Sequence, residues 1–308
     1  MRTRHSFRCT AVFLAFLIAA IASSSAIGQV RDVAVLATYA YPKYDRASAL
    51  QPLADHLAAR TKVPVVVRLY DSPRMLVEAV RSGAADLAVT NTFAGLALLD
   101  AGEAQALAVF EIPSETAERY RGVLLAGIKA GPKDDAALAR SPARWRMAQV
   151  VPGSTSGGLV QDLHLAALGR SSDYAALKYA GSHEGALAAL RAGEVDVAAL
   201  ADTPWRDALA REPSLAASVR ELWRSAPIPP GPVVCRNGAR LSCDAAREVL
   251  LGLHRDVPAV LAALAGAWSE AAGATRLVAV DRAQYLGLAQ GFHSPEARSA
   301  ALRRLLDY

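Results

Sequence analysis

Residues 75–89 read MLVEAVRSGAADLAV, and residues 185–200 read GALAALRAGEVDVAAL. Each stretch begins with a predicted helix that has apolar residues on one face and ends at a small residue followed by glycine. A turn with an acidic residue then leads into a short apolar run. Such a run is typical of a strand that is buried on both faces of a parallel sheet. The two stretches therefore predict the same helix–turn–strand unit twice, which suggests two similarly built lobes.

Strands and helices alternate on both sides of these two units. The first series predicts strands at 32–38, 64–70, 85–90, 105–112 and 120–128, and helices at 47–60, 73–81 and 93–101. The second series predicts strands at 144–151, 174–179 and 195–200, and helices at 156–168, 184–192 and 204–211. A last stretch predicts a strand at 233–235 and helices at 244–254, 257–272 and 295–305. This order predicts an α/β fold with two lobes, each a mostly parallel sheet flanked by helices.

The first 28 residues have the order of a secretory signal peptide. Three arginines precede an uncharged apolar run at 9–22, and small residues fill 23–28. About 14 apolar residues are fewer than the roughly 20 that a membrane anchor needs, and Cys9 lies on the wrong side of the run for a lipoprotein. Cleavage after Ala26 and cleavage after Gly28 both fit. We expect export to the periplasm and no stable membrane insertion after cleavage.

Charge and composition exclude several classes of function. The net charge is +5, and signal cleavage would remove three arginines and no acidic residue, leaving about +2. Arginines are scattered and form no basic run, so we expect no nucleic-acid partner. The sequence has no cofactor lysine motif, metal-ligand cluster or catalytic triad spacing, so we expect no enzyme, no cofactor and no metal. We expect a monomer.

Cys235 and Cys243 remain after the signal leaves with Cys9. They are an even pair in an oxidising compartment, and the turn-forming pair 237–238 (Asn-Gly) lies between them. A disulfide is therefore expected, with two free buried thiols as the alternative. The spacing does not fit a zinc site.

Residues 153–158, GSTSGG, form the most informative short motif. They lie between a predicted strand and a predicted helix, where glycines admit close approach and free helix N–H groups favour an anion. Ser154, Thr155 and Ser156 add hydroxyl donors. The alternative is a merely capped helix. A nucleophile elbow fails because Thr155 stands where serine is needed, and a phosphate loop fails because Leu159 follows the last glycine.

Other polar clusters also fall at the carboxyl ends of predicted strands, where open α/β sheets bind ligands. They could equally be ordinary loop and capping residues. They are Tyr39 and Tyr41, Asn91 and Thr92, His183, and Asp202.

Four segments resemble the phosphate/phosphite/phosphonate-binding periplasmic proteins of ABC transporters. They are QPLADHLAARTKVPVVVRLYDSPRMLVEAVRSGAADLAV at 51–89, VVPGSTSGGLVQDLHL at 150–165, GSHEGALAALRAGEVDVAALADTPW at 181–205 and SAPIPPGPVVCR at 225–236. They run in the family's order and cover most of the chain after the signal. The resemblance implies a type II periplasmic-binding fold with a hinge, and a membrane permease as partner.

The resemblance also implies a set of ligand contacts. Ser154, Thr155, Ser156 and His183 would hold a phosphorus oxyanion, Asp202 would occupy an acidic ligand position, and Tyr39 or Tyr41 would supply an aromatic contact. Hinge closure would bring in Asn91. The loop at 90–93 departs from the family, which often has a Gly-Pro-aromatic pattern there, so the organic substituent stays open.

We expect a signal peptide at 1–28, the first part of lobe 1 at 29–128, lobe 2 at 129–228, and a return to lobe 1 with C-terminal helices at 229–308. The expected function is capture of a small anionic ligand, a phosphonate, phosphite or phosphate, for an ABC importer. Two alternatives stay open: a sensory protein of the same fold, and a binder of another small anion such as a sulfonate.

Overall fold

The computed structural model describes residues 33–170, 173–281, 285 and 294–306. The expected signal peptide, residues 1–28, lies outside the described residues. Within the described part of the chain, no single helix is long and apolar enough to cross a membrane; α9 (Cys243–Asp256) and α10 (Pro258–Gly266) meet that test only as a pair, which is bent by 102°.

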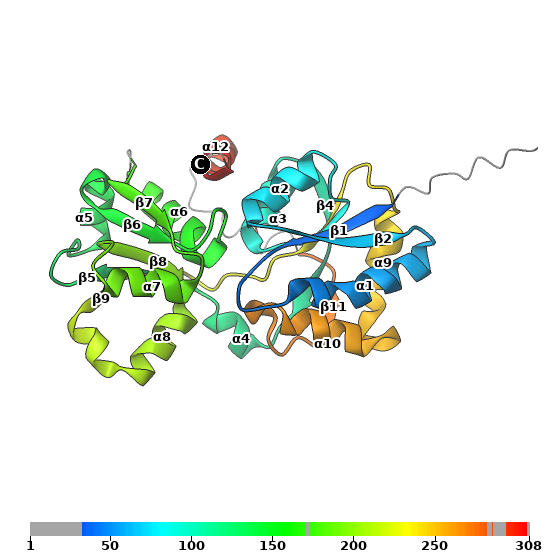
Figure 1. Ribbon diagram of the computed structural model, residues 1–308. Helices are drawn as coiled ribbons and strands as arrows, with labels where there is room; N and C mark the ends of the chain where they lie inside the picture. Colours follow the sequence, from blue (N-terminus) through cyan, green and yellow to red (C-terminus); the bar gives the residue numbers. More distant parts are fainter. Residues whose placement is uncertain (1–32, 171–172, 282–284, 286–293, 307–308) are drawn as a thin grey trace, which may run out of the picture. The chain divides into compact units, whose positions relative to one another are not determined.

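The first sheet has the strand order β11-β4-β10-β3-β1-β2. Figure 1 labels its strands β1, β2, β4 and β11. Its parallel core is β2-β1-β3, and β10 pairs antiparallel with both β3 and β4. The strands are β1 (Ala34–Tyr39), β2 (Val65–Tyr70), β3 (Leu87–Val89), β4 (Ala104–Glu111), β10 (Val233–Arg236) and β11 (Arg276–Val278).

Helices cover both faces of this sheet because successive strand residues point to opposite sides. Leu36 and Leu87 pack into one core with α1 (Arg46–Thr61), α9 and α10. Val35 and Ala88 pack into the other with α2 (Pro73–Arg81) and α3 (Thr92–Asp100). Leu302 of α12 (Pro295–Leu306) joins this second core.

The second sheet repeats the arrangement with the order β7-β6-β8-β5-β9. Its parallel core is β7-β6-β8, and β5 pairs antiparallel with both β8 and β9. The strands are β5 (Gly122–Gly127), β6 (Arg146–Gln149), β7 (Ala176–Tyr179), β8 (Val197–Ala201) and β9 (Val219–Arg224).

This sheet is also buried on both faces. Val123 and Leu125 of β5 face a core with α7 (His183–Arg191) and α8 (Asp202–Arg211), while Leu124 between them faces α5 (Asp135–Arg140) and α6 (Val160–Ala167). The predicted α/β class with two sheets flanked by helices is confirmed.

Strand β5 corrects one expected boundary. Residues 120–128 were expected to end the first part of lobe 1, but β5 belongs to the second sheet. The chain therefore passes from the first sheet to the second after β4, through α4 (Ser114–Arg119), and returns between β9 and β10. An apolar run predicts a buried strand but does not indicate in which sheet the strand lies, because pairing is decided by long-range contacts.

The two helix–turn–strand units have the same turn geometry. Gly83 and Gly193 both adopt positive φ, +78° and +71°, which favours glycine because other residues are strained there. In the first unit, Asp86 donates its backbone N–H to Val35 and accepts the Val35 N–H through Oδ2, both at 2.9 Å. In the second unit, Asp196 makes the same pair of 2.9 Å bonds with Arg146.

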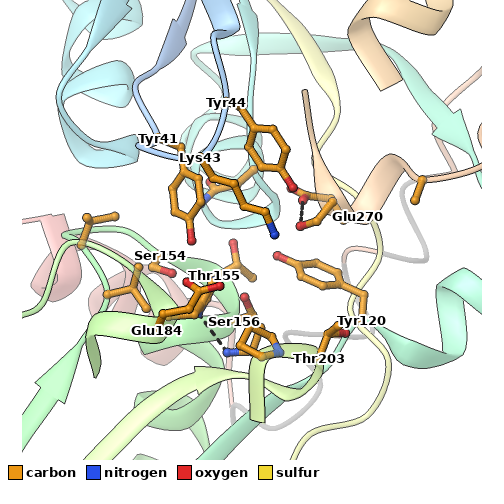
Figure 2. Close-up of a pocket in the computed structure, with 18 of the residues that line it drawn as sticks. Tyr41, Lys43, Tyr44, Tyr120, Ser154, Thr155, Ser156, Glu184, Thr203 and Glu270 are labelled. Carbon is orange, nitrogen blue, oxygen red and sulfur yellow. Dashed lines mark hydrogen bonds between the residues drawn. The ribbon is translucent and has the colours of Figure 1, made fainter. Parts of the chain in front are cut away.

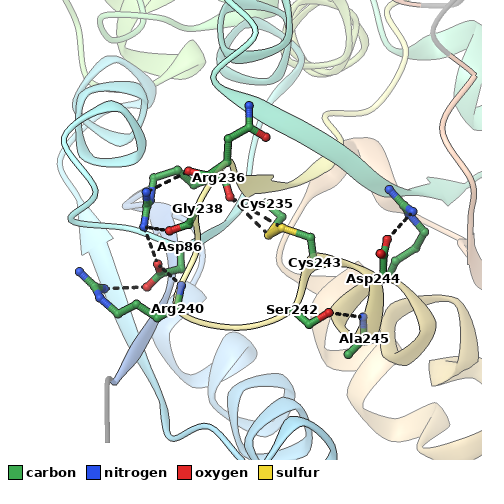
Figure 3. The surroundings of a disulfide bond; sticks show 11 residues. Asp86, Cys235, Arg236, Gly238, Arg240, Ser242, Cys243, Asp244 and Ala245 are labelled. Carbon is green, nitrogen blue, oxygen red and sulfur yellow. Dashed lines mark hydrogen bonds and ion pairs between the residues drawn. A yellow bond between two sulfur atoms is a disulfide. The ribbon is translucent and has the colours of Figure 1, made fainter. Parts of the chain in front are cut away.

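Asp86 is fully buried and joins this turn to the loop between β10 and α9 (Figure 3). Its carboxylate pairs with Arg236 at 3.1 Å and Arg240 at 2.7 Å. The predicted disulfide between Cys235 and Cys243 closes the same loop, with a Cα–Cα distance of 5.8 Å. A cross-link over such a short loop stabilises the fold by about 2–3 kcal/mol in the chain-entropy model.

Substituting Asp86→Asn should lower the free energy of unfolding by about 3 kcal/mol, because two arginines then lose a buried carboxylate partner. Urea unfolding followed by circular dichroism measures this. Asp244→Asn is the matched control, because the side chain of Asp244 is 85% exposed in its ion pair with Arg247. Equal midpoints for the two variants would contradict the role given to Asp86.

Candidate functional site

A cavity of about 280 Å³ lies where strands of both sheets end (Figure 2). Tyr39 ends β1 and Tyr41 follows it, and Asn91 follows β3. From the second sheet come residues 154–156 after β6 and His183 after β7. The structure therefore brings these predicted positions together around one cavity, and their contact with a ligand stays a prediction.

Residues 154–156 are held in a tight turn at the start of α6. Ser154 caps the turn by accepting the Gly157 N–H at 3.2 Å, and Thr155–Leu159 forms a π-helical turn that leads into the helix. A side chain at Gly157 would lie 2.3 Å from the Val150 side chain, so only glycine lets this turn pack against β6. The three hydroxyl residues are buried, and all three line the cavity.

Two hydrogen bonds connect this turn to the start of α3. The Phe93 N–H donates to Thr155 Oγ1 at 2.9 Å, and Asn91 Nδ2 donates to the Gly153 carbonyl at 2.8 Å. Thr155 Oγ1 accepts one bond, and its hydroxyl can still donate its own hydrogen to a group in the cavity that it lines. Gly153, at φ +81°, packs against the Phe93 ring so closely that an added Cβ would lie 2.8 Å from it.

His183 has a defined protonation state. Its Nδ1 accepts the Ala201 N–H at 3.0 Å, so the proton of the neutral ring must sit on Nε2. Burial lowers the pKa of His183 to about 4, and the charge of Lys43 adds to this lowering. The ring is therefore a neutral donor at physiological pH.

Tyr41, and not Tyr39, faces the histidine. The Tyr41 and His183 rings are 6.3 Å apart, and burial raises the pKa of Tyr41 to about 12, so its hydroxyl keeps its proton. Tyr39 is 6% exposed and stacks on the Arg46 guanidinium at 4.2 Å. The sequence left the choice between the two tyrosines open, and their contacts separate them.

Two expected site residues do not line the cavity. The side chain of Asp202 is 1% exposed and pairs with Arg206 at 2.6 Å and with Arg224. Thr92 donates its hydroxyl to the Pro229 carbonyl at 2.6 Å. The expectation that Asp202 contacts the ligand does not fit this geometry, because both carboxylate oxygens face arginines and its neighbours Ala201 and Thr203 line the cavity instead.

Sequence reasoning missed several lining residues. Lys43 lies in the same loop as Tyr41, so its position after the first predicted strand could have marked it as a cavity residue. Tyr120 precedes β5, and Glu270 lies in the 3₁₀ turn Ser269–Ala271; neither carries a local signal. Burial raises the pKa of Tyr120, so this phenol also stays protonated.

The lowered pKa of His183 predicts a loss of stability in acid. The unfolded state takes up this proton below pH 6.5 but the folded state only near pH 4, so stability falls as the pH decreases between these values. Between about pH 7 and about pH 5 the loss should be about 2 kcal/mol. Urea unfolding at both pH values measures it, and His183→Gln should remove this part of the pH dependence. Parallel pH profiles for the two proteins would contradict the assignment.

Comparison with solved structures shows the same fold in several binding proteins. XAC2383 from Xanthomonas citri, bound to chloride ion, is 21% identical with a TM-score of 0.65, covering 89% of this chain and 99% of the other. A binding protein component of an ABC phosphonate transporter from Pseudomonas aeruginosa is 19% identical with a TM-score of 0.60, covering 89% and 94%. PhnD1 from Prochlorococcus marinus, in complex with methylphosphonate, is 15% identical with a TM-score of 0.56, covering 84% and 96%.

A search of curated protein sequences finds no significant match. The family model described as "ABC transporter, phosphonate, periplasmic substrate-binding protein" matches residues 37–285. This match spans both sheets and every residue of the cavity described above. The chain therefore belongs to the family of periplasmic substrate-binding proteins of phosphonate ABC transporters, as the resemblance of its motifs implied.

Proposed function

We propose that this protein captures a phosphonate, or the related phosphite or phosphate, in the cavity and delivers it to an ABC permease. The observation that supports this most is the set of neutral donors at the strand ends: the hydroxyls of Ser154, Thr155 and Ser156 and the Nε2–H of His183. An oxyanion accepts such bonds without needing a buried counter-charge on the same side.

Two of the donors have hydrogen-bond partners that leave a hydrogen available for the anion. Thr155 uses its oxygen on the Phe93 N–H, and His183 uses Nδ1 on the Ala201 N–H. The neutral His183 ring then has only its Nε2–H left to give, and the Thr155 hydroxyl still has its hydrogen to donate. The π-helical turn adds the free N–H groups of a helix start, whose dipole favours negative charge.

Capture would work through closure of the two lobes, with the two segments that connect the lobes acting as the hinge. One connecting segment runs from β4 to β5, and the other runs from β9 to β10. Closure would bring Tyr41 and Asn91 from the first lobe against the anion held on the second. The protein would act as an exported monomer, after removal of residues 1–28, and would carry out no chemistry on the ligand.

The test is calorimetry on refolded, ligand-free protein with methylphosphonate, phosphite, phosphate and methanesulfonate. Wild-type protein should bind at least one phosphorus anion. Ser156→Ala should weaken that binding by about tenfold or more, because a hydrogen bond to a charged acceptor is lost.

Ser218→Ala is the matched control, because the hydroxyl of this exposed serine donates to the Leu215 carbonyl and the residue lies outside the cavity. It should leave binding unchanged. Absence of heat and of a thermal shift with every phosphorus anion would refute the proposal. Binding of methanesulfonate alone would favour the sulfonate alternative.

A further inference from the structure

The loop after β1 carries a lysine over the cavity. The N–H of Tyr44 donates to the Tyr41 carbonyl at 3.0 Å, which closes a tight turn with Lys43 at its tip. The Lys43 side chain is exposed, and its ammonium lies 5.9 Å from the centre of the Tyr44 ring. Figure 2 shows it pointing into the cavity, toward Tyr120 and away from the loop.

The charges around the cavity cancel formally. The hydroxyls of residues 154–156 and the neutral His183 ring contribute no charge to the cavity. The charged lining residues are three cations and three carboxylates: Lys43, Arg46, Arg119, Glu184, Asp207 and Glu270. An anion that enters the cavity loses water, and each of its charges then needs a nearby partner.

Two of the three cations are engaged with other groups. Arg46 donates to the carbonyls of Ala267 at 3.2 Å and Tyr39 at 3.1 Å, and its guanidinium stacks on Trp268 at 4.5 Å. Arg119 pairs with Glu115 at the surface, where its side chain is 67% exposed. Within the described part of the chain, Lys43 has no carboxylate within ion-pair distance, and its ammonium lies near the Tyr44 ring.

The charge of Lys43 acts on His183, which lies on the opposite wall of the cavity. It is one of the causes that lower the pKa of His183, and the Tyr41 ring of the same loop lies 6.3 Å from the His183 ring. The lysine therefore faces the same volume as the hydroxyls of residues 154–156.

On the basis of the proposed function, we infer that Lys43 balances the second negative charge of the ligand. The site then selects a dianion, such as a phosphonate, over a monoanion of the same shape, such as a sulfonate. A monoanion is satisfied by the neutral donors. The additional negative charge of a dianion, close to Glu184 and Glu270, requires a cation that can move to it. A flexible lysine, with three rotatable donors, meets this need.

The experiment compares methylphosphonate and methanesulfonate by calorimetry at about pH 8.5, where the phosphonate is doubly charged and lysine is still protonated. Wild-type protein should prefer methylphosphonate. Lys43→Gln should weaken methylphosphonate binding by about tenfold or more and change methanesulfonate binding far less, so that the preference collapses. Lys43→Arg should keep most of the preference.

Lys133→Gln removes an equal charge at an exposed position outside the cavity and should leave both affinities unchanged. If Lys43→Gln weakens both ligands by the same factor, or neither, the inference is overturned while the proposed function stands. If wild-type protein binds no phosphorus anion, both are overturned.

Discussion

The hydrogen bond from the Phe93 N–H to Thr155 Oγ1, 2.9 Å long, is the contact around which the site is organised. It joins the start of α3, beside the first sheet, to the turn that opens α6 beside the second. With the Asn91 bond to the Gly153 carbonyl, it sets residues 153–155 against the other half of the chain. It also positions the Thr155 hydroxyl, which accepts this bond and can still donate its own hydrogen.

The same logic holds for His183, where a backbone N–H occupies Nδ1 and leaves Nε2 as a donor. Both residues are thus neutral groups that can donate a hydrogen to a ligand. Positive charge comes from the first-sheet side, where Arg46 is fixed among aromatic rings and Lys43 lies on an exposed turn. In the proposed function the neutral donors would recognise the shape of an oxyanion, and Lys43 would balance its second charge.

Much of this arrangement follows from local sequence. The two helix–turn–strand units were predicted from apolar spacing and a glycine stop, and both turns contain a left-handed glycine and an aspartate that clamps the neighbouring strand. The loop at 153–158 was predicted because glycines and hydroxyls followed a strand. These features depend on residues that are close together in the chain, so they can be predicted from the sequence.

The rest depends on contacts distant in sequence. Strand β5 has the apolar pattern of any buried strand, and only its pairing with β8 and β9 assigns it to the second sheet. Asp202 lies at a strand end as expected, but Arg206 and Arg224 turn its carboxylate away from the cavity. Glu270 reaches the cavity from the far end of the chain, and no local pattern marks it.

The most direct test of the central claim is a crystal structure of the protein grown with methylphosphonate. The claim predicts the phosphonate oxygens within hydrogen-bond distance of the hydroxyls of Ser154, Thr155 and Ser156 and of His183 Nε2. A methylphosphonate seated elsewhere in the cavity, with these four donors unused, would contradict it.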